Sequence, residues 1–431
     1  MLACETPRET PFAARPQRPL PRARGACAAG VLRDGLVKVA IVGGGVMGCA
    51  TALALADRGI DVVVLERAVP GAEASSAAAG MLGAQAELHA RPRAEDPALM
   101  VRARDAWGPW ARELREVTGI DVGYRVTGVL RVAFDEAERA GLAQEVAWQQ
   151  SCGLRASLLD GVEAHEVEPM LAPSVVGAAF YADDGQVDPP ALLRALVAAA
   201  ARSARITIRS GATVQRLLIE GATADATRTA TDLPTGRATR DAIEGSRCAG
   251  VVLDDGELRA DATVLAAGSW SSLVPGVPSS LPVVKPVRGQ LLMLEERPPR
   301  ARSIVFGAGT YVVPRGDGRV VCGTTMENAG FRREVTAAGL DAILRGSLAC
   351  LPGLGTAQFT SAWSSFRPHV AGDVPLVGAS PLPGLFLATG HHRNGILLSK
   401  LTAETVANAV CARSALTNVS ADLDKPGREN Q

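Results

Sequence analysis

The fold is decided by one stretch near the N-terminus, Val39-Ala40-Ile41-Val42-Gly43-Gly44-Gly45-Val46-Met47-Gly48. Its apolar start is typical of a strand, its glycines satisfy G-x-G-x-x-G, and residues 49–58 continue as an apolar helix. A second β-branched run, 60–65, ends on Glu66. In such a unit the glycines let a pyrophosphate approach, the helix N-terminus binds the phosphates, and the acid accepts hydrogen bonds from a ribose. The stretch therefore predicts a bound dinucleotide rather than a bare glycine turn.

Composition limits the class of protein further. The 431 residues are enough for two or three domains, and 45 basic residues balance 45 acidic ones. A net charge of zero argues against a general nucleic-acid or anionic-membrane binder. The eight cysteines are scattered and form no C-x-x-C pair, which fits a reducing cytoplasm better than a disulfide framework or a zinc site. We therefore expect a cytoplasmic protein with no metal site.

Two segments imitate signals that they do not carry. Residues 39–56 are uncharged and long enough to resemble a membrane span, but the glycine turn makes them a βα unit. Residues 1–36 are rich in Pro, Arg and Ala without an apolar core, so they predict a disordered tail rather than a secretory signal. A transit peptide is the alternative, although the segment has no serine. A second tail is expected at 416–431.

Three later segments supply small residues or turns that suit a ligand site. Residues 73–81 are a run of small residues, and the buried strand pattern of 261–270 ends in Ala266-Ala267-Gly268, where backbone could approach a cofactor. Residues 311–325 form two apolar arms around Gly316-Asp317-Gly318, which predicts a hairpin. Residues 363–377 are expected to be irregular because they contain proline. Plain turns and connectors are the alternative reading of the small-residue runs.

A second candidate for cofactor binding lies near the C-terminus. Gly390-His391-His392-Arg393-Asn394-Gly395 follows a short buried strand and leads into a helix. Its N–H groups and helix dipole could face the anionic edge of a reduced flavin ring, although an ordinary strand-to-helix turn has the same spacing. Only one glycine fingerprint is present. This favours one bound redox cofactor and an external acceptor such as oxygen.

Several short motifs, in order along the chain, resemble one family. They are Ser76-Ala77-Ala78-Ala79-Gly80-Met81-Leu82, Tyr311-Val312-Val313-Pro314-Arg315, Gly323-Thr324-Thr325-Met326, Phe366-Arg367-Pro368 and Gly390 to Leu398. Together they resemble the glycine oxidases, the thiamine-pathway members of the D-amino-acid oxidase superfamily. The resemblance runs from about 37 to 412.

The resemblance implies an α/β fold. A Rossmann-type FAD-binding domain of the glutathione-reductase kind would be joined to a second α+β substrate domain built on a mixed or antiparallel sheet. The implied FAD-binding segments are 37–90, 180–272 and 362–415. The implied substrate domain consists of 91–179 and 273–361.

The resemblance also implies which residues bind FAD. Together with the glycine fingerprint, they are Gly43, Gly45, Val46, Met47, Gly48, Glu66, Arg67, Ala74, Ser75, Ala79, Gly80, Met81, Val214, Gly268, Gly390, His391, His392, Arg393, Asn394, Gly395, Ile396 and Leu397. Related sarcosine oxidases attach flavin through a cysteine near the Arg367 motif. Ser364-Ser365-Phe366 has none there, so FAD is expected to be non-covalent.

The substrate residues follow from the same motif matches. Arg367 would bind a substrate carboxylate, Tyr311 would hydrogen-bond it, Arg393 would lie near it, and Met326 would form part of the wall. Two departures leave exact specificity open. His369-Val370-Ala371-Gly372-Asp373 stands where a Gly-Thr step is more usual, and His392 stands where an aromatic residue is usual.

No acid–base pair is visible in the sequence, and none is expected to be catalytic. Hydride transfer from the α-carbon of a neutral amine to flavin N5 needs orientation rather than a protein base. The implied reaction converts glycine, sarcosine or small D-amino acids to an imine or glyoxylate, ammonia and hydrogen peroxide. Implied partners are oxygen, a homotetramer and hand-over to thiazole synthase. The alternatives are a quinone-dependent D-amino-acid dehydrogenase and a non-catalytic binding protein of the same fold.

Overall fold

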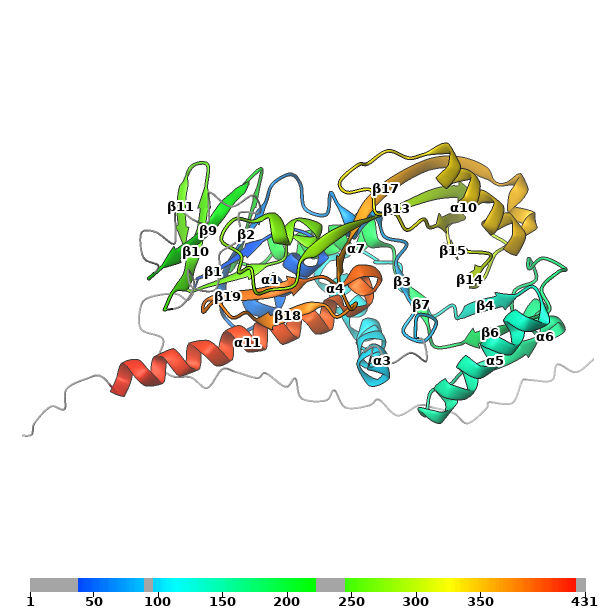
Figure 1. The fold of residues 1–431 in the computed structure, drawn as a ribbon, viewed down its shortest axis with the longest axis horizontal. Helices are drawn as coiled ribbons and strands as arrows, with labels where there is room; N and C mark the ends of the chain where they lie inside the picture. The colour runs from blue at the N-terminus through cyan, green and yellow to red at the C-terminus, as the bar shows by residue number, and fades with distance from the viewer. Residues whose placement is uncertain (1–37, 89–95, 222–244, 424–431) are drawn as a thin grey trace, which may run out of the picture.

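The structure is a computed structural model that describes residues 38–88, 96–221 and 245–423 (Figure 1). The expected tail at 1–36 lies outside the described residues. The last helix, α11 (Gly395–Leu423), runs into the first part of the expected tail at 416–431, and residues 424–431 lie outside the described residues. Among the described residues, no helix has both the length and the hydropathy that a membrane span needs.

The first layer is a mostly parallel sheet with the strand order β18-β19-β12-β1-β2-β8. Its strands are β1 (Lys38–Val42), β2 (Asp61–Glu66), β8 (Ile206–Ser210), β12 (Ala262–Leu265), β18 (Leu376–Ala379) and β19 (Leu385–Thr389). Only β18 pairs antiparallel to its neighbour. β1 and β2 are apolar and buried on both sides, as expected of strands in a covered parallel sheet.

Helices cover one face of this sheet and a small antiparallel sheet covers the other. On the helical side, α1 (Val46–Ala56) packs against α7 (Pro189–Ala201) and α11, and Figure 1 shows α11 running beneath β18 and β19. On the other side, β9 (Val214–Glu220), β10 (Arg247–Leu253) and β11 (Gly256–Arg259) form an antiparallel sheet. Val42, Leu65 and Val251 belong to one core cluster, which joins the two sheets.

The second layer is a larger mixed sheet with the order β17-β13-β16-β15-β14-β4-β6-β5. Its strands are β4 (Val129–Ala133), β5 (Ser157–Asp160), β6 (Gly177–Tyr181), β13 (Val284–Glu295), β14 (Ile304–Gly307), β15 (Thr310–Pro314), β16 (Arg319–Gly323) and β17 (Gln358–Val370). All neighbours pair antiparallel except β14 with β4. The predicted mixed sheet and the hairpin around Gly316-Asp317-Gly318 are therefore confirmed.

The remaining elements fill the connections and edges. They are α2 (Ala74–Ala77), β3 (Met81–Leu82), α3 (Pro97–Asp105), α4 (Trp107–Thr118), α5 (Glu136–Ser151), α6 (Gly161–Val167), β7 (Gly185–Gln186), η1 (Gly268–Leu273), α10 (Ala337–Cys350), η2 (Pro352–Thr356) and η3 (His392–Asn394). α10 packs on the large sheet against β13, β14, β15 and β16.

Several boundaries differ from the expectation. Two of the expected domain boundaries fall inside strands, the one at 179/180 in β6 and the one at 361/362 in β17. Because each of these strands pairs along its whole length with a neighbour in the large sheet, the divisions belong at strand ends. The expectation of irregular structure at 363–377 is wrong up to Val370, since β17 is continuous there. Pro368 is tolerated because β17 is an edge strand.

Trp107 joins the helical layer to the start of α11. Its ring is fully buried beside Trp110, with the ring centroids 4.8 Å apart, and its Nε1 donates to Leu397 O at 3.0 Å. Both rings belong to the core cluster of the helical layer. Since Leu397 directly follows the 390–396 turn, Trp107 also holds the base of that turn.

We predict that Trp107→Phe lowers the free energy of unfolding by about 1–3 kcal/mol, because it leaves the Leu397 carbonyl buried without its donor. Trp107→Ala is expected to cost about 3–5 kcal/mol through the cavity it creates. Urea unfolding monitored by circular dichroism measures both, with Trp110→Phe as the aromatic control. Equal losses in Trp107→Phe and Trp110→Phe would contradict a special role for the Trp107 hydrogen bond.

Candidate active site

One large cavity lies where the two sheets meet, with a volume of about 1590 Å³. Its walls come from the carboxyl ends of β1, β2 and β12, from the 390–396 turn, and from β13, β15 and β17 of the large sheet. In open parallel sheets, ligands bind at this end of the strands. The cavity therefore lies where the glycine fingerprint predicts a dinucleotide.

The glycine turn is shaped by contacts that exclude a side chain. Gly43 has φ +109°, and a Cβ there would lie 2.5 Å from Ala266 O on the neighbouring strand. A Cβ on Gly48 would lie 1.9 Å from Gly43 O. The first glycine therefore brings the turn against β12, and Gly48 brings α1 against the turn.

Glu66 is held in a fixed orientation at the end of β2. Its Oε2 accepts from Gly44 N at 2.8 Å and its Oε1 accepts from Ala68 N at 2.9 Å. The residue is only 9% exposed and lines the cavity. Because each carboxylate oxygen has further lone pairs, Glu66 can accept hydrogen bonds from a bound hydroxyl without rearranging.

Trp270 forms part of the cavity wall near the glycine turn. The guanidinium of Arg67 lies over the Trp270 ring, 4.0 Å from its centroid, and both residues line the cavity. Ser75 Oγ accepts from Val46 N at 3.0 Å, which ties α2 to the N-terminus of α1. These contacts fix the small-residue segment against the glycine turn.

The 390–396 turn carries one buried histidine, His391, and one half-buried histidine, His392. His391 Nε2 lies 2.9 Å from Thr402 Oγ1, and burial lowers the pKa of His391 to about 3. Burial is also the main reason why the pKa of His392 falls to about 4, and the neighbouring His369 adds to it. Both imidazoles are therefore neutral at neutral pH, and neither supplies a positive charge to the cavity.

Arg367 presents its guanidinium to the cavity from β17. Its Nη2 donates to Thr324 Oγ1 at 2.8 Å and its Nη1 donates to Thr325 O at 3.3 Å. A Cβ on Gly289 of the paired strand would lie 2.3 Å from Arg367 Nη1. Gly289 therefore makes room for this arginine across the sheet.

Tyr311 lies beside Arg367. Burial raises the pKa of the Tyr311 phenol, and its contact with Arg367 opposes that rise. A Cβ on Gly323 would lie 2.8 Å from the Tyr311 hydroxyl, so a second glycine makes room for the ring. The phenol stays protonated at neutral pH and can donate a hydrogen bond next to the guanidinium.

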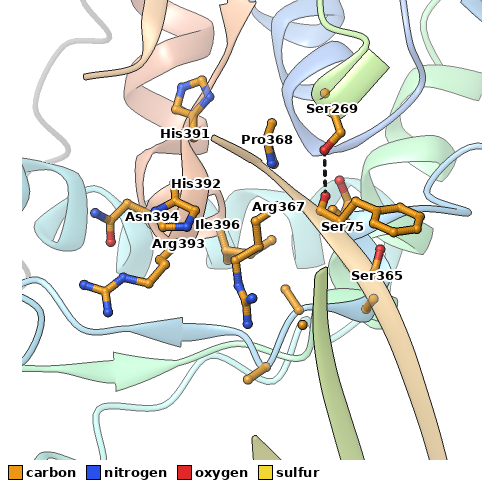
Figure 2. A pocket seen from close by; sticks show the side chains of 18 of the residues that line it. Ser75, Ser269, Ser365, Arg367, Pro368, His391, His392, Arg393, Asn394 and Ile396 are labelled. Carbon is orange, nitrogen blue, oxygen red and sulfur yellow. Dashed lines mark hydrogen bonds between the residues drawn. The ribbon is translucent and has the colours of Figure 1, made fainter. Parts of the chain in front are cut away.

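Arg393 and Met326 complete this end of the cavity. Arg393 Nη2 lies 3.1 Å from Glu87 Oε2, and Figure 2 shows Arg393, His392 and Arg367 next to one another. Met326 lines the cavity at its rim, where it is 58% exposed. Two guanidinium groups from β17 and η3 thus converge on one region.

All but three of the site residues expected from the sequence line this cavity. The exceptions are Gly48, Gly390 and Leu397. Gly48 packs the helix on the turn. Gly390 has φ +82°, and a Cβ there would lie 2.6 Å from Val370 Cγ2, so it shapes the turn instead. The Leu397 side chain is buried in the helical core.

The cavity also contains residues that the sequence did not point to. Glu87, Trp270 and Ser365 line it, and no motif identifies any of them. Two buried polar atoms of lining residues have no hydrogen-bond partner within the described part of the chain: Ser365 Oγ and His392 Nε2. Unpartnered buried polar atoms are costly, so their gathering here indicates a polar ligand that satisfies them.

The comparisons with known proteins give the class. A model of the family described as "FAD dependent oxidoreductase" (DAO) matches residues 38–409. The chain belongs to this family of FAD-dependent oxidoreductases, and its cofactor is FAD. The glycine turn, the fixed Glu66 carboxylate and the unpartnered polar atoms of the cavity all fit such a dinucleotide.

Individual relatives are more specific. The chain is 36% identical over 377 residues to the glycine oxidase of Geobacillus kaustophilus, covering 86% of this chain and 92% of that protein. The bifunctional protein ThiO/ThiG of Nostoc sp. is 33% identical over 376 residues, and the chain spans about half (52%) of that protein. The crystal structure of the Geobacillus kaustophilus glycine oxidase matches with a TM-score of 0.75 at 34% identity, over 88% of this chain and 95% of that chain.

We predict that Glu66→Ala weakens FAD binding about 10- to 100-fold, because the carboxylate both fixes the glycine turn and accepts hydrogen bonds. The dissociation constant is measured by titrating FAD into the apoprotein and following the quenching of flavin fluorescence. Asp61→Ala is the matched control, since Asp61 stands at the other end of β2 in an exposed pair with Arg205. An unchanged FAD affinity in Glu66→Ala would contradict the assignment.

Proposed function

We propose that this FAD-dependent oxidoreductase oxidises glycine and other small amines, such as sarcosine and small D-amino acids. The observation that carries the proposal is the pair formed by Arg367 and Tyr311. It offers a planar cation and a neutral hydroxyl to one region of the FAD cavity. Relatives named glycine oxidase, at up to 36% identity over most of their length, support the same substrate class.

Arg367 is suited to bind a carboxylate because one edge of its guanidinium is already fixed. Thr324 and Thr325 accept from its two terminal nitrogens, which orients the group before a substrate arrives. A preoriented guanidinium loses little conformational freedom on binding, and its remaining N–H groups can contact both carboxylate oxygens. Tyr311 donates to the same carboxylate.

The cavity is built for orientation rather than for proton transfer. His391 and His392 are neutral and Tyr311 stays protonated, as their pKa shifts require. Glu87 is paired with Arg393. The chain's own residues therefore bind the carboxylate, hold the amine substrate against one wall and exclude water from it. Bound FAD supplies the two-electron acceptor for the substrate's α-carbon–hydrogen bond.

The overall reaction that we propose consumes glycine, oxygen and water and yields glyoxylate, ammonia and hydrogen peroxide. We propose that FAD is held non-covalently, since no cysteine is found among the described residues that line the cavity. The FAD-binding part would comprise the parallel sheet with its helices, and the substrate part the large mixed sheet. Residues Arg367, Tyr311, Arg393 and Met326 would contact the substrate.

A link to thiamine biosynthesis is part of the proposal. Several relatives carry the name "Bifunctional protein ThiO/ThiG", and this chain aligns with about half of each. A second activity in the same polypeptide supports hand-over of the oxidation product to a thiazole-forming partner. We further propose a cytoplasmic location and a homotetramer, both as the family resemblance implies.

We predict that Arg367→Ala raises the KM for glycine strongly and lowers kcat/KM about 100-fold or more, because charge-assisted hydrogen bonds to the carboxylate are lost. The flavin absorbance spectrum should stay that of the bound cofactor. Steady-state kinetics with glycine measure the change. Arg332→Ala is the control, since that exposed side chain donates to Ala329 O and, within the described part of the chain, to no other group. Unchanged kinetics in Arg367→Ala would exclude it as the carboxylate ligand.

We predict that the purified protein releases about one hydrogen peroxide per glycine consumed in air, because one two-electron oxidation reduces one oxygen. A peroxidase-coupled assay beside an oxygen electrode measures this ratio. A soluble quinone supplied without oxygen is the comparison. Rapid turnover with the quinone and no peroxide in air would identify a dehydrogenase instead. A protein that takes up no FAD would identify a non-catalytic member.

A further inference from the structure

Three side chains with metal-ligating atoms meet beside the cavity. They are His369 at the end of β17, Asp373 in the following turn, and His392 in η3. His369 Nε2 lies 3.2 Å from Asp373 Oδ1, and His392 Nδ1 lies 3.3 Å from the same oxygen. All three atoms lie within 4.8 Å of one another, and no other such group of three occurs among the described residues. None of the three is a ligand in the proposed carboxylate site.

The spacing of these atoms suits one small dication. Zinc binds imidazole nitrogen and carboxylate oxygen at about 2.0–2.2 Å. Ligands at that distance in a tetrahedral site lie about 3.3–3.6 Å apart. The two pairs at 3.2 and 3.3 Å are close to this separation. The rings of His369 and His392 already lie side by side, with their centroids 4.7 Å apart.

The backbone that presents the three groups is unusual. Among the described residues, three that are not glycine have positive φ angles, and two of them are Asp373 at +59° and His392 at +48°. Such conformations are disfavoured for residues with a side chain and often mark functional positions. A backbone bridge between His369 and His391 holds the end of β17 against the 390–396 turn. The fold therefore brings the three groups together at the expense of local strain.

We propose that His369 Nε2, Asp373 Oδ1 and His392 Nδ1 form a binding site for a zinc-type dication. The fourth position would remain open to water or a small anion, since Asp373 is half-exposed. The spacing of the cysteines led us to expect no metal site. The proposed site was not visible to that argument, because its ligands are histidine and aspartate side chains from separate segments. It goes beyond the proposed oxidase activity and does not depend on it.

The position of the site gives it a regulatory role. Asp373 and His392 also line the cavity, whereas His369 does not. A bound dication would fix the His392 ring and tie the end of β17, which carries Arg367, to the turn that carries Arg393. These two guanidinium groups act on His392 and oppose a further positive charge. Their charge is therefore expected to weaken dication binding.

The test uses the FAD-bound full-length protein after treatment with EDTA and its removal. Isothermal titration with zinc chloride is expected to give about one zinc per chain. Asp373→Asn keeps the size of the side chain and tolerates the positive φ, and His369→Asn removes the second ligand. Each is expected to weaken zinc binding at least about 10-fold. Loss of a group that only orients a metal ligand already costs about 10-fold in affinity, and loss of the ligand itself should cost no less. His165→Asn, in α6, is the control and should bind zinc as the parent protein does.

The flavin absorbance spectrum and circular dichroism verify that each variant is folded, and His369→Asn carries the test if Asp373→Asn does not fold. Absence of zinc binding in the parent protein would overturn the proposal, and so would parental affinity in either folded variant. In the first case the cluster is only a contact between two histidines and an aspartate. If zinc also changes the KM of the parent protein but not of His369→Asn, the regulatory role is supported. An equal change in both would overturn that role.

Discussion

Antiparallel pairing of β13 with β17 runs from Val284↔Val370 to Glu295↔Gln358, and it carries Arg367 from the large sheet to the cofactor cavity. The pairing fixes Arg367 opposite Val287 and places Gly289 where its missing side chain leaves room for the guanidinium. A shift of one residue would turn Arg367 to the other face of the sheet. The substrate end of the cavity therefore depends on the register of this one strand pair.

The parts of the fold with a strong local pattern were predictable from sequence. The β1–α1–β2 unit, the hairpin of β15 and β16, and the 390–396 turn each combine apolar runs with glycines whose positions have a steric reason. The continuous β17 strand was not, because Arg367-Pro368 resembles a break. In the structure Pro368 faces Pro286 across the pair, and β17 stands at the sheet edge. Edge position is a tertiary property that no local pattern contains.

The same distinction holds within the site. Most of the expected cofactor residues line the cavity. They belong to segments rich in glycine and other small residues, a composition that predicts close approach of the backbone to a ligand. Glu87, Trp270 and Ser365 join them only through the folding of distant segments. Likewise, His369, Asp373 and His392 stand out along the chain only as departures from the family pattern, and their spacing predicts no metal site. They form a cluster because a backbone bridge and two left-handed residues bring two loops together.

The central position of β1 has a consequence for how the chain folds. β1 pairs with β2, which follows it closely, and with β12, where Lys38 N donates to Asp261 Oδ2 across 223 positions. Pairing of strands so far apart in the sequence is slow. The Ala266 carbonyl, which lies against Gly43 of the glycine turn, reaches its place only when β12 has paired with β1. Cofactor capture is therefore a late event in folding. A ligand that binds only the finished sheet stabilises the whole chain through mass action, so the folded fraction is expected to rise with the concentration of flavin.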